Sequence, residues 1–137
     1  MKDCIFCNLQ TFKDSIYQDE KVFVIVSQNP INKYHSLVIP KKHYRNMVDI
    51  PDDLLSHIIN ISKKISSAVR KASKADAITH VSEDDISNKG YNQVNHFKFH
   101  VIPRYEKDMK LIDWSPMRVK SSGKDIRKYT NEIRKQL

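Results

Sequence analysis

The chain has 137 residues, enough for one domain with one hydrophobic core. Hydrophobic residues make up 39% and charged residues 29%, which is typical of a soluble globular protein rather than a disordered or fibrous one. No apolar run approaches the roughly 20 residues that a membrane-spanning helix needs, and the N-terminus carries no secretory pattern. We therefore expect a single domain over residues 1–137, located in the cytoplasm and without a membrane partner.

The net charge is +8, because 24 lysine and arginine residues stand against 16 aspartate and glutamate residues. This excess favours anionic partners such as phosphates, nucleotides or nucleic acids, but it does not choose among them. Much of it lies in residues 63–74 and in the tail from Lys120 onward, where a solvated helix face is the simpler explanation. A nucleic-acid partner is compatible with this charge but is not favoured by it.

The first feature along the chain is the run CIFC, which contains the only two cysteines, Cys4 and Cys7. In a reducing compartment, this spacing indicates a redox pair or half of a metal site rather than a structural disulfide. A redox pair typically opens a helix that follows a strand, and no strand pattern precedes these cysteines. Zinc is the better interpretation, provided that the chain supplies two further ligands.

Two short apolar runs follow, KVFVIVSQ at 21–28 and HSLVIPKKH at 35–43, joined by the turn-rich connector NPINKY. Their β-branched residues and their boundaries predict a pair of strands. Residues 49–74 then place apolar side chains at helical spacing, with Asp52 and Asp53 at the start and basic residues at the end. Because these charges complement the helix dipole, the pattern predicts one long amphipathic helix.

The second half of the chain predicts two more strands and another helix. The run at 76–83 alternates as a strand, residues 84–93 form a loop, and the run at 94–105 alternates again. In the segment 121–137, apolar residues recur at i, i+3, i+7 and i+11, which predicts a terminal helix. The order of elements predicts an α+β fold, an antiparallel sheet with one long helix and a C-terminal helix.

The last predicted strand contains the run NHFKFHVIPR, whose alternate residues carry contrasting chemistry. A period of two places His96, Lys98 and His100 on one face. The other face carries apolar side chains and is expected to join the core, namely Phe97, Phe99 and Val101. The first face brings two imidazoles and one ammonium group together.

Four runs, CIFC, HSLVIPKKH, HFKFHVIPRY and DWSPM, together resemble the histidine-triad (HIT) family, in that order and over nearly the whole chain. The family's active-site strand reads His-x-His-x-His, so Lys98 stands at the position of the middle histidine, between His96 and His100. The resemblance implies a HIT-like fold. It also implies a homodimer in which the long helix and a neighbouring strand form the contact.

The resemblance further implies a zinc site, whose ligands would be Cys4, Cys7, His43 and His96. Two thiolates and two imidazoles suit a closed, tetrahedral, structural zinc site rather than a catalytic one. In the alternative interpretation, His43 is a surface histidine and His96 is hydrogen-bonded within the fold, since some family members keep the fold without metal.

In the family, the middle histidine attacks the α-phosphorus of a nucleoside phosphate or phosphoramidate, and neighbouring histidines bind phosphate oxygens and help to move protons. Those neighbours would be His100 and His35. A neutral imidazole offers a lone pair near pH 7, whereas a lysine with a pKa of about 10.4 is almost wholly protonated. About 1 in 2,500 such lysines is neutral, a handicap of about 4.6 kcal/mol. Lys98 is therefore a weak nucleophile but a good phosphate-binding cation.

Other departures from the family pattern also fall at ligand positions. Ser27 stands where the family often has an aspartate that accepts hydrogen bonds from ribose, and Tyr34 stands where a glycine usually precedes the histidine. The Gly-Gln pair before the triad is replaced as well, so glycine-assisted backbone approach to a phosphate is scarce. The expected nucleotide- or phosphate-binding residues are Ser27, Asn29, His35, Asn92, Gln93, Lys98 and His100.

These observations predict a divergent HIT-family protein that binds a nucleotide or another phosphate-containing small molecule, with the usual histidine-nucleophile activity weak or absent. Two alternatives stay open. In the first, the protein is an active nucleoside phosphate or phosphoramidate hydrolase, or a nucleotidyl transferase, that uses Lys98 with a depressed pKa or another group. In the second, it has a nucleic-acid-linked role, which salt-dependent oligonucleotide binding would reveal.

Overall fold

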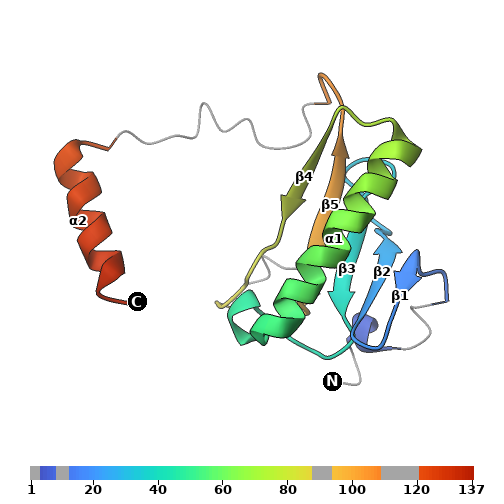
Figure 1. Cartoon of the computed structure of the whole chain (residues 1–137), viewed down its shortest axis with the longest axis horizontal. Coiled ribbons are helices and arrows are strands. Elements are labelled where there is room, and N and C mark those ends of the chain that lie inside the picture. Colours follow the sequence, from blue (N-terminus) through green and yellow to red (C-terminus); the bar gives the residue numbers. More distant parts are fainter. Residues whose placement is uncertain (1–3, 9–12, 88–93, 109–120) are drawn as a thin grey trace.

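The computed structural model describes residues 4–8, 13–87, 94–108 and 121–137 (Figure 1). They form short 3₁₀ helices (η), two α-helices and a sheet. In chain order, the elements are η1 (Ile5–Cys7), β1 (Tyr17–Gln18), β2 (Val22–Val26), β3 (Ser36–Pro40), η3 (Met47–Asp49), α1 (Asp52–Ser73), β4 (Ala77–Val81), β5 (Phe99–Arg104) and α2 (Gly123–Arg134). The predicted α+β fold with an antiparallel sheet is confirmed.

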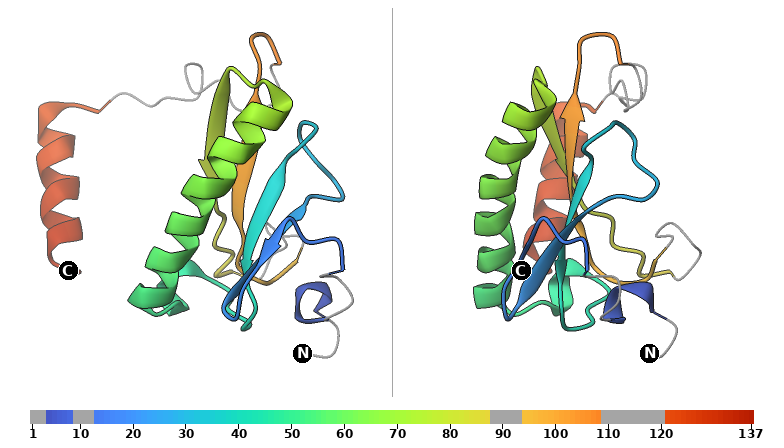
Figure 2. Two further views of the ribbon diagram at one scale, coloured as in Figure 1. Left: turned by 45° about the vertical axis from the view of Figure 1, so that its right-hand side comes forward. Right: turned by 90° about the vertical axis from the view of Figure 1, so that its right-hand side faces the viewer.

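The five strands form one sheet in the order β1-β2-β3-β5-β4, and all neighbouring strands are antiparallel. At its centre, Val24 of β2 pairs with Val38 of β3, and Leu37 of β3 pairs with His100 of β5. Helix α1 covers one face of the sheet, while η1 lies at the other face (Figure 2). The sheet is therefore covered on both faces at β2 and β3.

This double coverage explains why β2 and β3 have nearly continuous apolar sequences rather than alternating ones. Residues on the α1 side form one core cluster, which includes Val24, Ile58 and Phe97, all fully buried. Residues on the other side form a second cluster around Phe6 and Phe23. Burial of each such side chain contributes roughly 1.5–3 kcal/mol relative to exposure, so both faces stabilise the fold.

Helix α1 begins at Asp52 rather than at residue 49. Pro51 occupies the N-cap position, and residues 47–49 form the separate turn η3. Acidic residues in the first turn and basic residues in the last turn match the helix dipole, as the sequence predicts. The helix ends at Ser73, and its C-cap residue Lys74 adopts a left-handed conformation with φ of 53°.

The strand predicted over 94–105 is wrong in its first half, because β5 begins only at Phe99. Upstream, the amide of His96 folds back to the carbonyl of Val94 at 2.7 Å, and the amide of Phe97 donates to the carbonyl of Tyr44 at 2.6 Å. These bonds replace the sheet ladder. The alternation of side chains persists all the same, since Phe97, Phe99 and Val101 all contact the α1-side core.

The C-terminal helix α2 is confirmed and begins with a capping box, in which the side chains and amides of Ser122 and Asp125 satisfy each other. It stands apart from the sheet (Figure 1). None of its residues is buried, and its apolar stripe of Ile126, Tyr129 and Ile133 is exposed. No described helix combines the length and the apolar character that a membrane crossing requires.

Candidate functional site

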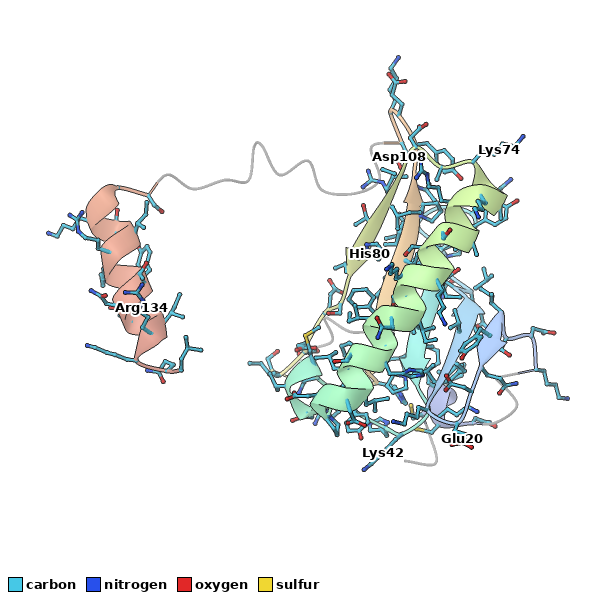
Figure 3. All side chains as sticks on the ribbon, in the orientation of Figure 1. Glu20, Lys42, Lys74, His80, Asp108 and Arg134 are labelled. Atoms are coloured by element: carbon cyan, nitrogen blue, oxygen red, sulfur yellow. The ribbon has the colours of Figure 1, made fainter. Side chains whose placement is uncertain are left out.

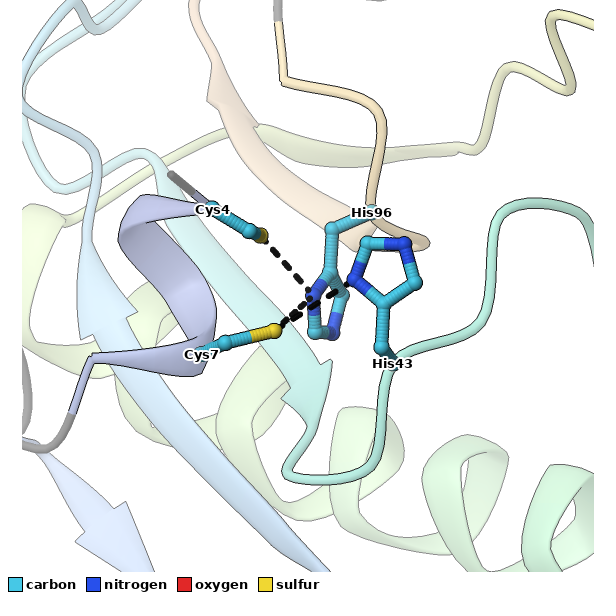
Figure 4. Close-up of side chains that lie close together, drawn as sticks. All are labelled: Cys4, Cys7, His43 and His96. Atoms are coloured by element: carbon cyan, nitrogen blue, oxygen red, sulfur yellow. Dashed lines mark hydrogen bonds between the residues drawn. The ribbon is translucent and has the colours of Figure 1, made fainter. Parts of the chain in front are cut away.

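Four side chains with metal-binding atoms converge at one end of the sheet, although they are distant in sequence (Figure 4). Cys4 immediately precedes η1 and Cys7 is its last residue, while His43 follows β3 and His96 precedes β5. Their candidate ligand atoms all lie within 4.8 Å of one another. The structure thus brings together the four residues that the resemblance names as zinc ligands.

The tautomer of His96 suits metal binding. Its Nε2 atom lies 2.8 Å from the carbonyl oxygen of Pro40. Because a carbonyl oxygen can only accept, Nε2 carries the hydrogen and the neutral ring has its lone pair on Nδ1. That atom faces the thiols, at 3.4 Å from Sγ of Cys4 and 3.6 Å from Sγ of Cys7. A carbonyl behind a ligating histidine is a common support at metal sites.

The spacing of the four atoms also fits zinc. Tetrahedral zinc, with Zn–S of about 2.3 Å and Zn–N of about 2.0–2.1 Å, separates sulfur from nitrogen by about 3.5 Å. The distances of 3.4 and 3.6 Å at His96, and of 3.4 Å between Sγ of Cys7 and Nδ1 of His43, match this value. The donor set of two thiols and two imidazoles is that of a structural site.

Burial controls the protonation of this cluster. It lowers the pKa of His96 to about 4 and also lowers the pKa of His43, so both imidazoles are in the neutral form that binds metals. Burial raises the pKa of the Cys7 thiol. A bound cation would reverse that preference, because a coordinated thiol loses its proton.

The four candidate ligands Cys4, Cys7, His43 and His96 form the metal cluster of this protein. A cavity of about 300 Å³ opens beside it, on the face of the sheet away from α1. Its volume lies at the lower end of the range for small-molecule sites. The lining residues are Ile5, Phe6, Ile25, Ser27, Gln28, Asn29, Ile31, His35, Leu37, Val94, Lys98 and His100. The wall is mostly apolar, and its polar side chains come from three places: the residues after β2, His35 just before β3, and Lys98 and His100 around the start of β5.

Two histidines of the cavity form a directed hydrogen-bond chain. The amide of Ile31 donates to Nδ1 of His35 at 3.1 Å, so the hydrogen of neutral His35 is on Nε2. Nε2 lies 2.9 Å from Nδ1 of His100, which therefore accepts. This leaves Nε2 of His100 as an N–H donor on a side chain that lines the cavity.

Both rings stay neutral at pH 7. Burial lowers the pKa of His35, and burial together with the charges of His35 and Lys98 lowers the pKa of His100 to about 4. The His100 side chain is only partly exposed, so protonating its ring inside the protein would cost desolvation free energy. The pair can therefore offer one hydrogen-bond donor to an anion without adding positive charge.

Lys98 lines the same cavity and supplies its positive charge. Its Nζ donates to the carbonyl of Val94 at 3.0 Å and to the carbonyl of His96 at 3.5 Å, and it lies 5.9 Å from the ring centroid of Phe6. Burial lowers its pKa to about 8, which leaves roughly nine in ten side chains charged at pH 7.

Although the alternation predicts His96 on the same face as Lys98 and His100, His96 is not among the residues that line the cavity. Its ring is fully buried and turns toward Cys4 and Cys7, where it contacts the edge of the Phe6 ring. The backbone turns at residues 94–96, and β5 begins only at Phe99, so the His96 side chain is presented from outside the strand. His96 therefore belongs to the metal cluster alone.

Five of the predicted phosphate-binding residues line the cavity, namely Ser27, Asn29, His35, Lys98 and His100. Asn92 and Gln93 lie outside the described residues. Sequence reasoning missed the apolar wall, which includes Ile5 and Phe6. No local pattern marks these two residues, because their place in the cavity depends on the contacts of the neighbouring cysteines with histidines far along the chain.

Tyr34 occupies the position at which the resemblance leads us to expect a glycine, and its φ of 69° lies in the left-handed region. Only glycine adopts this conformation without strain. Tyr34 immediately precedes His35 and its side chain is half exposed. The chain thus keeps the backbone turn before His35 although the residue that best suits it is absent.

Comparisons with known proteins find similar chains. The family model described as the HIT domain matches residues 8–107. An uncharacterized HIT-like protein of Saccharolobus solfataricus is 33% identical over 122 residues, which cover 86% of each chain. The adenylylsulfatase HINT3 of Arabidopsis thaliana is 28% identical over 109 residues, which cover 77% of this chain and 54% of the relative.

Solved structures share the fold. A HIT-family protein of Bacillus subtilis superposes with a TM-score of 0.82 at 26% identity, covering 98% of this chain and 97% of that one. A zinc-bound histidine-triad protein of Mycobacterium smegmatis gives 0.71 at 24% identity, covering 99% of both chains. A histidine-triad nucleotide-binding protein of Candida albicans gives 0.80 at 22% identity, covering 97% of this chain and 96% of that one.

Proposed function

The chain belongs to the HIT family, and from this premise we propose that it binds a nucleotide or another phosphate-containing small molecule in the cavity beside the metal cluster. The observation that carries the proposal is the convergence of Lys98, His100 and His35 on that cavity. One relative is named an adenylylsulfatase and one structural neighbour a nucleotide-binding protein, so phosphate-containing ligands occur among similar proteins.

Each polar residue has a role in this proposal. Lys98 attracts the phosphate as a cation, and the Nε2 hydrogen of His100 donates to one phosphate oxygen. Ser27 and Asn29, at the end of β2 and just beyond it, offer hydrogen bonds to the rest of the ligand, and the apolar wall accepts a flat ring. From the sequence alone, we propose that Asn92 and Gln93 contribute as well.

We also propose that the usual histidine-nucleophile activity is weak or absent. Lys98 occupies the nucleophile position, it is mostly protonated at pH 7, and its ammonium group donates to the carbonyl of Val94. A protonated amine has no lone pair for attack on phosphorus. Lys98 therefore acts in binding rather than in covalent catalysis.

Calorimetric titration with adenosine monophosphate tests the binding proposal. We expect Lys98→Gln to weaken binding at least tenfold, because it removes the only cation that lines the cavity among the described residues. Lys63→Gln removes an exposed charge from α1 and serves as the control, for which we expect unchanged affinity. If both variants bind equally more weakly than wild type, the binding depends on overall charge and not on Lys98. Titration with oligonucleotides at several salt concentrations would then test the nucleic-acid alternative.

Turnover assays on adenosine phosphoramidate and dinucleoside polyphosphates test the activity proposal. Wild-type protein should turn over neither at ordinary enzyme rates. A gain of turnover in Lys98→His would show that only the nucleophile is missing, whereas no gain would implicate Ser27, Tyr34 and the segment before the triad. Ordinary turnover by wild type, with a nucleotide adduct on Lys98 in mass spectra, would instead establish an active transferase or hydrolase.

For the metal cluster, we propose that Cys4, Cys7, His43 and His96 hold one structural zinc ion. The support is the match between the sulfur–nitrogen distances and tetrahedral zinc, together with the single available lone pair of His96. Because all four positions come from protein side chains, no position is left for substrate. A bound zinc ion would contribute folding free energy and no reaction step.

We propose further that the protein is a homodimer and works in the cytoplasm as a single domain over residues 1–137. Strand β4 supports the dimer, since it lies at one end of the sheet order and its outer edge pairs with no described strand. His80 marks this edge (Figure 3). Such an edge favours pairing with a second copy. A reducing cytoplasm would keep both cysteines available as ligands.

A further inference from the structure

The metal cluster and the ligand cavity share one short element, η1 (Ile5–Cys7). Cys4 is its N-cap and Cys7 its last residue, and their thiols point at the two histidines of the cluster. The two residues between them, Ile5 and Phe6, line the cavity. A segment of four residues therefore supplies half of the metal ligands and part of the cavity wall.

Phe6 makes the contacts that connect the two sites. Its side chain is only 7% exposed. Its ring packs edge-on against the His96 ring, with centroids 5.8 Å apart at 85°, and lies 6.4 Å from the ring of Phe23 in the sheet. On the cavity side, Nζ of Lys98 lies 5.9 Å from its centroid. Phe6 thus touches a metal ligand on one side and the phosphate-binding lysine on the other.

Two kinds of contact hold η1 against the sheet. The first is the packing of Phe6 within the apolar cluster that includes Phe23 and Ile39. The second is the pair of thiols at the ends of the run, facing His43 and His96. A 3₁₀ turn of three residues has little stability of its own. Metal bonds to Cys4 and Cys7 would therefore fix the position of the residues between them.

We propose that metal occupancy of this cluster and ligand binding in the cavity are coupled through Ile5 and Phe6, with Phe6 as the positioning residue. Metal binding orders the wall against which the ligand packs, so the ligand finds a formed site rather than ordering it at its own cost. This inference rests on the proposed nucleotide-phosphate function. It adds a regulatory link, in which zinc availability sets the ligand affinity.

Reciprocity gives the proposal a sharp test. If zinc raises the affinity for adenosine monophosphate by some factor, then adenosine monophosphate must raise the affinity for zinc by the same factor. We expect about tenfold in each direction, within the range of roughly 5–150-fold that couplings between sites span. Titration calorimetry on zinc-loaded and chelator-treated protein measures the first factor, and competition with a fluorescent zinc chelator, with and without the nucleotide, measures the second.

Two variants distinguish a loss of coupling between the sites from a general loss of folding. Phe6→Ala keeps all four metal ligands, so it should bind one zinc ion per chain but lose several-fold in nucleotide affinity, and its zinc affinity should no longer respond to the nucleotide. Ile78→Ala removes a similar apolar side chain on the α1 side of the sheet and should leave both factors unchanged. Circular dichroism checks that each protein is folded. If chelator-treated protein unfolds, the nucleotide affinities of zinc-loaded wild type, Phe6→Ala and Ile78→Ala test the coupling.

The outcomes are distinct. Coupling is overturned if folded, zinc-free protein binds the nucleotide as tightly as zinc-loaded protein, or if zinc-loaded Phe6→Ala keeps wild-type nucleotide affinity. If zinc-loaded wild type binds no adenosine monophosphate at all, the proposed function fails and the coupling fails with it. Equal factors in the two directions, abolished by Phe6→Ala and kept by Ile78→Ala, establish it.

Discussion

Nε2 of His35 lies 2.9 Å from Nδ1 of His100, and the amide of Ile31 fixes the direction of this hydrogen bond from behind. The backbone of one loop thereby decides which nitrogen of a histidine on another strand carries a proton. The hydrogen on Nε2 of His100, a residue that lines the cavity, is a consequence of that choice.

The neutral state of His100 predicts acid sensitivity. Burial holds its folded-state pKa at about 4, beneath the usual value of 6.5. As pH falls below 6.5, the unfolded chain takes up a proton that the folded ring resists, so the free energy of unfolding falls with pH toward 4. Between pH 7 and pH 5 this amounts to about 2 kcal/mol.

Urea unfolding of wild type and His100→Gln at pH 7, 6 and 5 checks this prediction. Glutamine can still accept from Nε2 of His35 but does not titrate. The variant should therefore lose less stability than wild type across this range. Acid loss of any bound metal affects both proteins alike, so identical pH profiles would show that His100 is protonated in the fold.

The strained turn before His35 predicts a stabilising substitution. Because Tyr34 has a φ of 69°, Tyr34→Gly should give a higher free energy of unfolding than Tyr34→Ala by about 1 kcal/mol. Both variants lose the half-exposed ring, so their difference isolates the backbone conformation. Thermal or denaturant unfolding measures it. Equal stabilities would mean that the loop relaxes to a negative φ once the tyrosine ring is gone.

The periodic parts of this fold were predictable from sequence because local pattern alone determines them. Helix α1 is predicted by the helical spacing of its apolar residues and by the charged residues at its two ends. Strands β2 and β3 are predicted by their apolar runs, which are nearly continuous because both faces of these strands are covered. Helix α2 likewise follows from the helical spacing of its apolar residues. Strand β1, at Tyr17–Gln18, has only two residues and no pattern, so sequence reasoning missed it.

The parts that sequence reasoning missed depend on distant contacts. The start of β5 is set by the bond from the amide of Phe97 to the carbonyl of Tyr44, which no local pattern reveals. That bend decides that His96 joins the metal cluster while Lys98 faces the cavity. Ile5 and Phe6 join the cavity for a similar reason, because the cysteines beside them meet histidines far along the chain.

A buried amide secures the loop that carries Ile31. Asn32 is 7% exposed, and its Nδ2 donates to the carbonyl of Pro103 at 2.9 Å and to Asp108 at 3.0 Å. Asn32→Ala leaves these acceptors without that donor and should lower the free energy of unfolding by about 1–3 kcal/mol. Asn32→Asp should cost more, because it sets a carboxylate against both oxygens.

Denaturant unfolding of these variants beside Asn60→Ala supplies the comparison. Asn60 is exposed on α1, and its substitution should change stability by less than about 0.5 kcal/mol. Since the Asn32 loop also positions the donor to His35, Asn32→Ala should weaken nucleotide binding as well. Wild-type affinity in that variant would show that the loop keeps its place without the amide.

The metal proposal predicts one zinc ion per chain and a stability that depends on it. Cys7→Ser should lose the ion. When the free zinc concentration is about 1,000 times the Kd for zinc, the free energy of unfolding of wild type should exceed that of the zinc-free protein by about 4 kcal/mol. Inductively coupled plasma mass spectrometry and thermal unfolding with and without chelator measure both effects. His80→Ala, a histidine outside the cluster, should keep the ion. A wild type purified without zinc, whose melting temperature ignores added zinc, would contradict the proposal.

The open edge of β4 predicts where a dimer contact forms. Val81 is 36% exposed on this strand, at the end of the sheet. Val81→Asp would place an unpaired charge in a contact that excludes water, so it should shift sedimentation toward the monomer. Val48→Asp, at an 83% exposed position in η3, is the matched control and should leave the dimer intact. In a two-fold symmetric dimer that pairs along β4, the two introduced carboxylates would lie near the axis and repel each other. If both variants sediment like wild type, the dimer contact must therefore lie elsewhere.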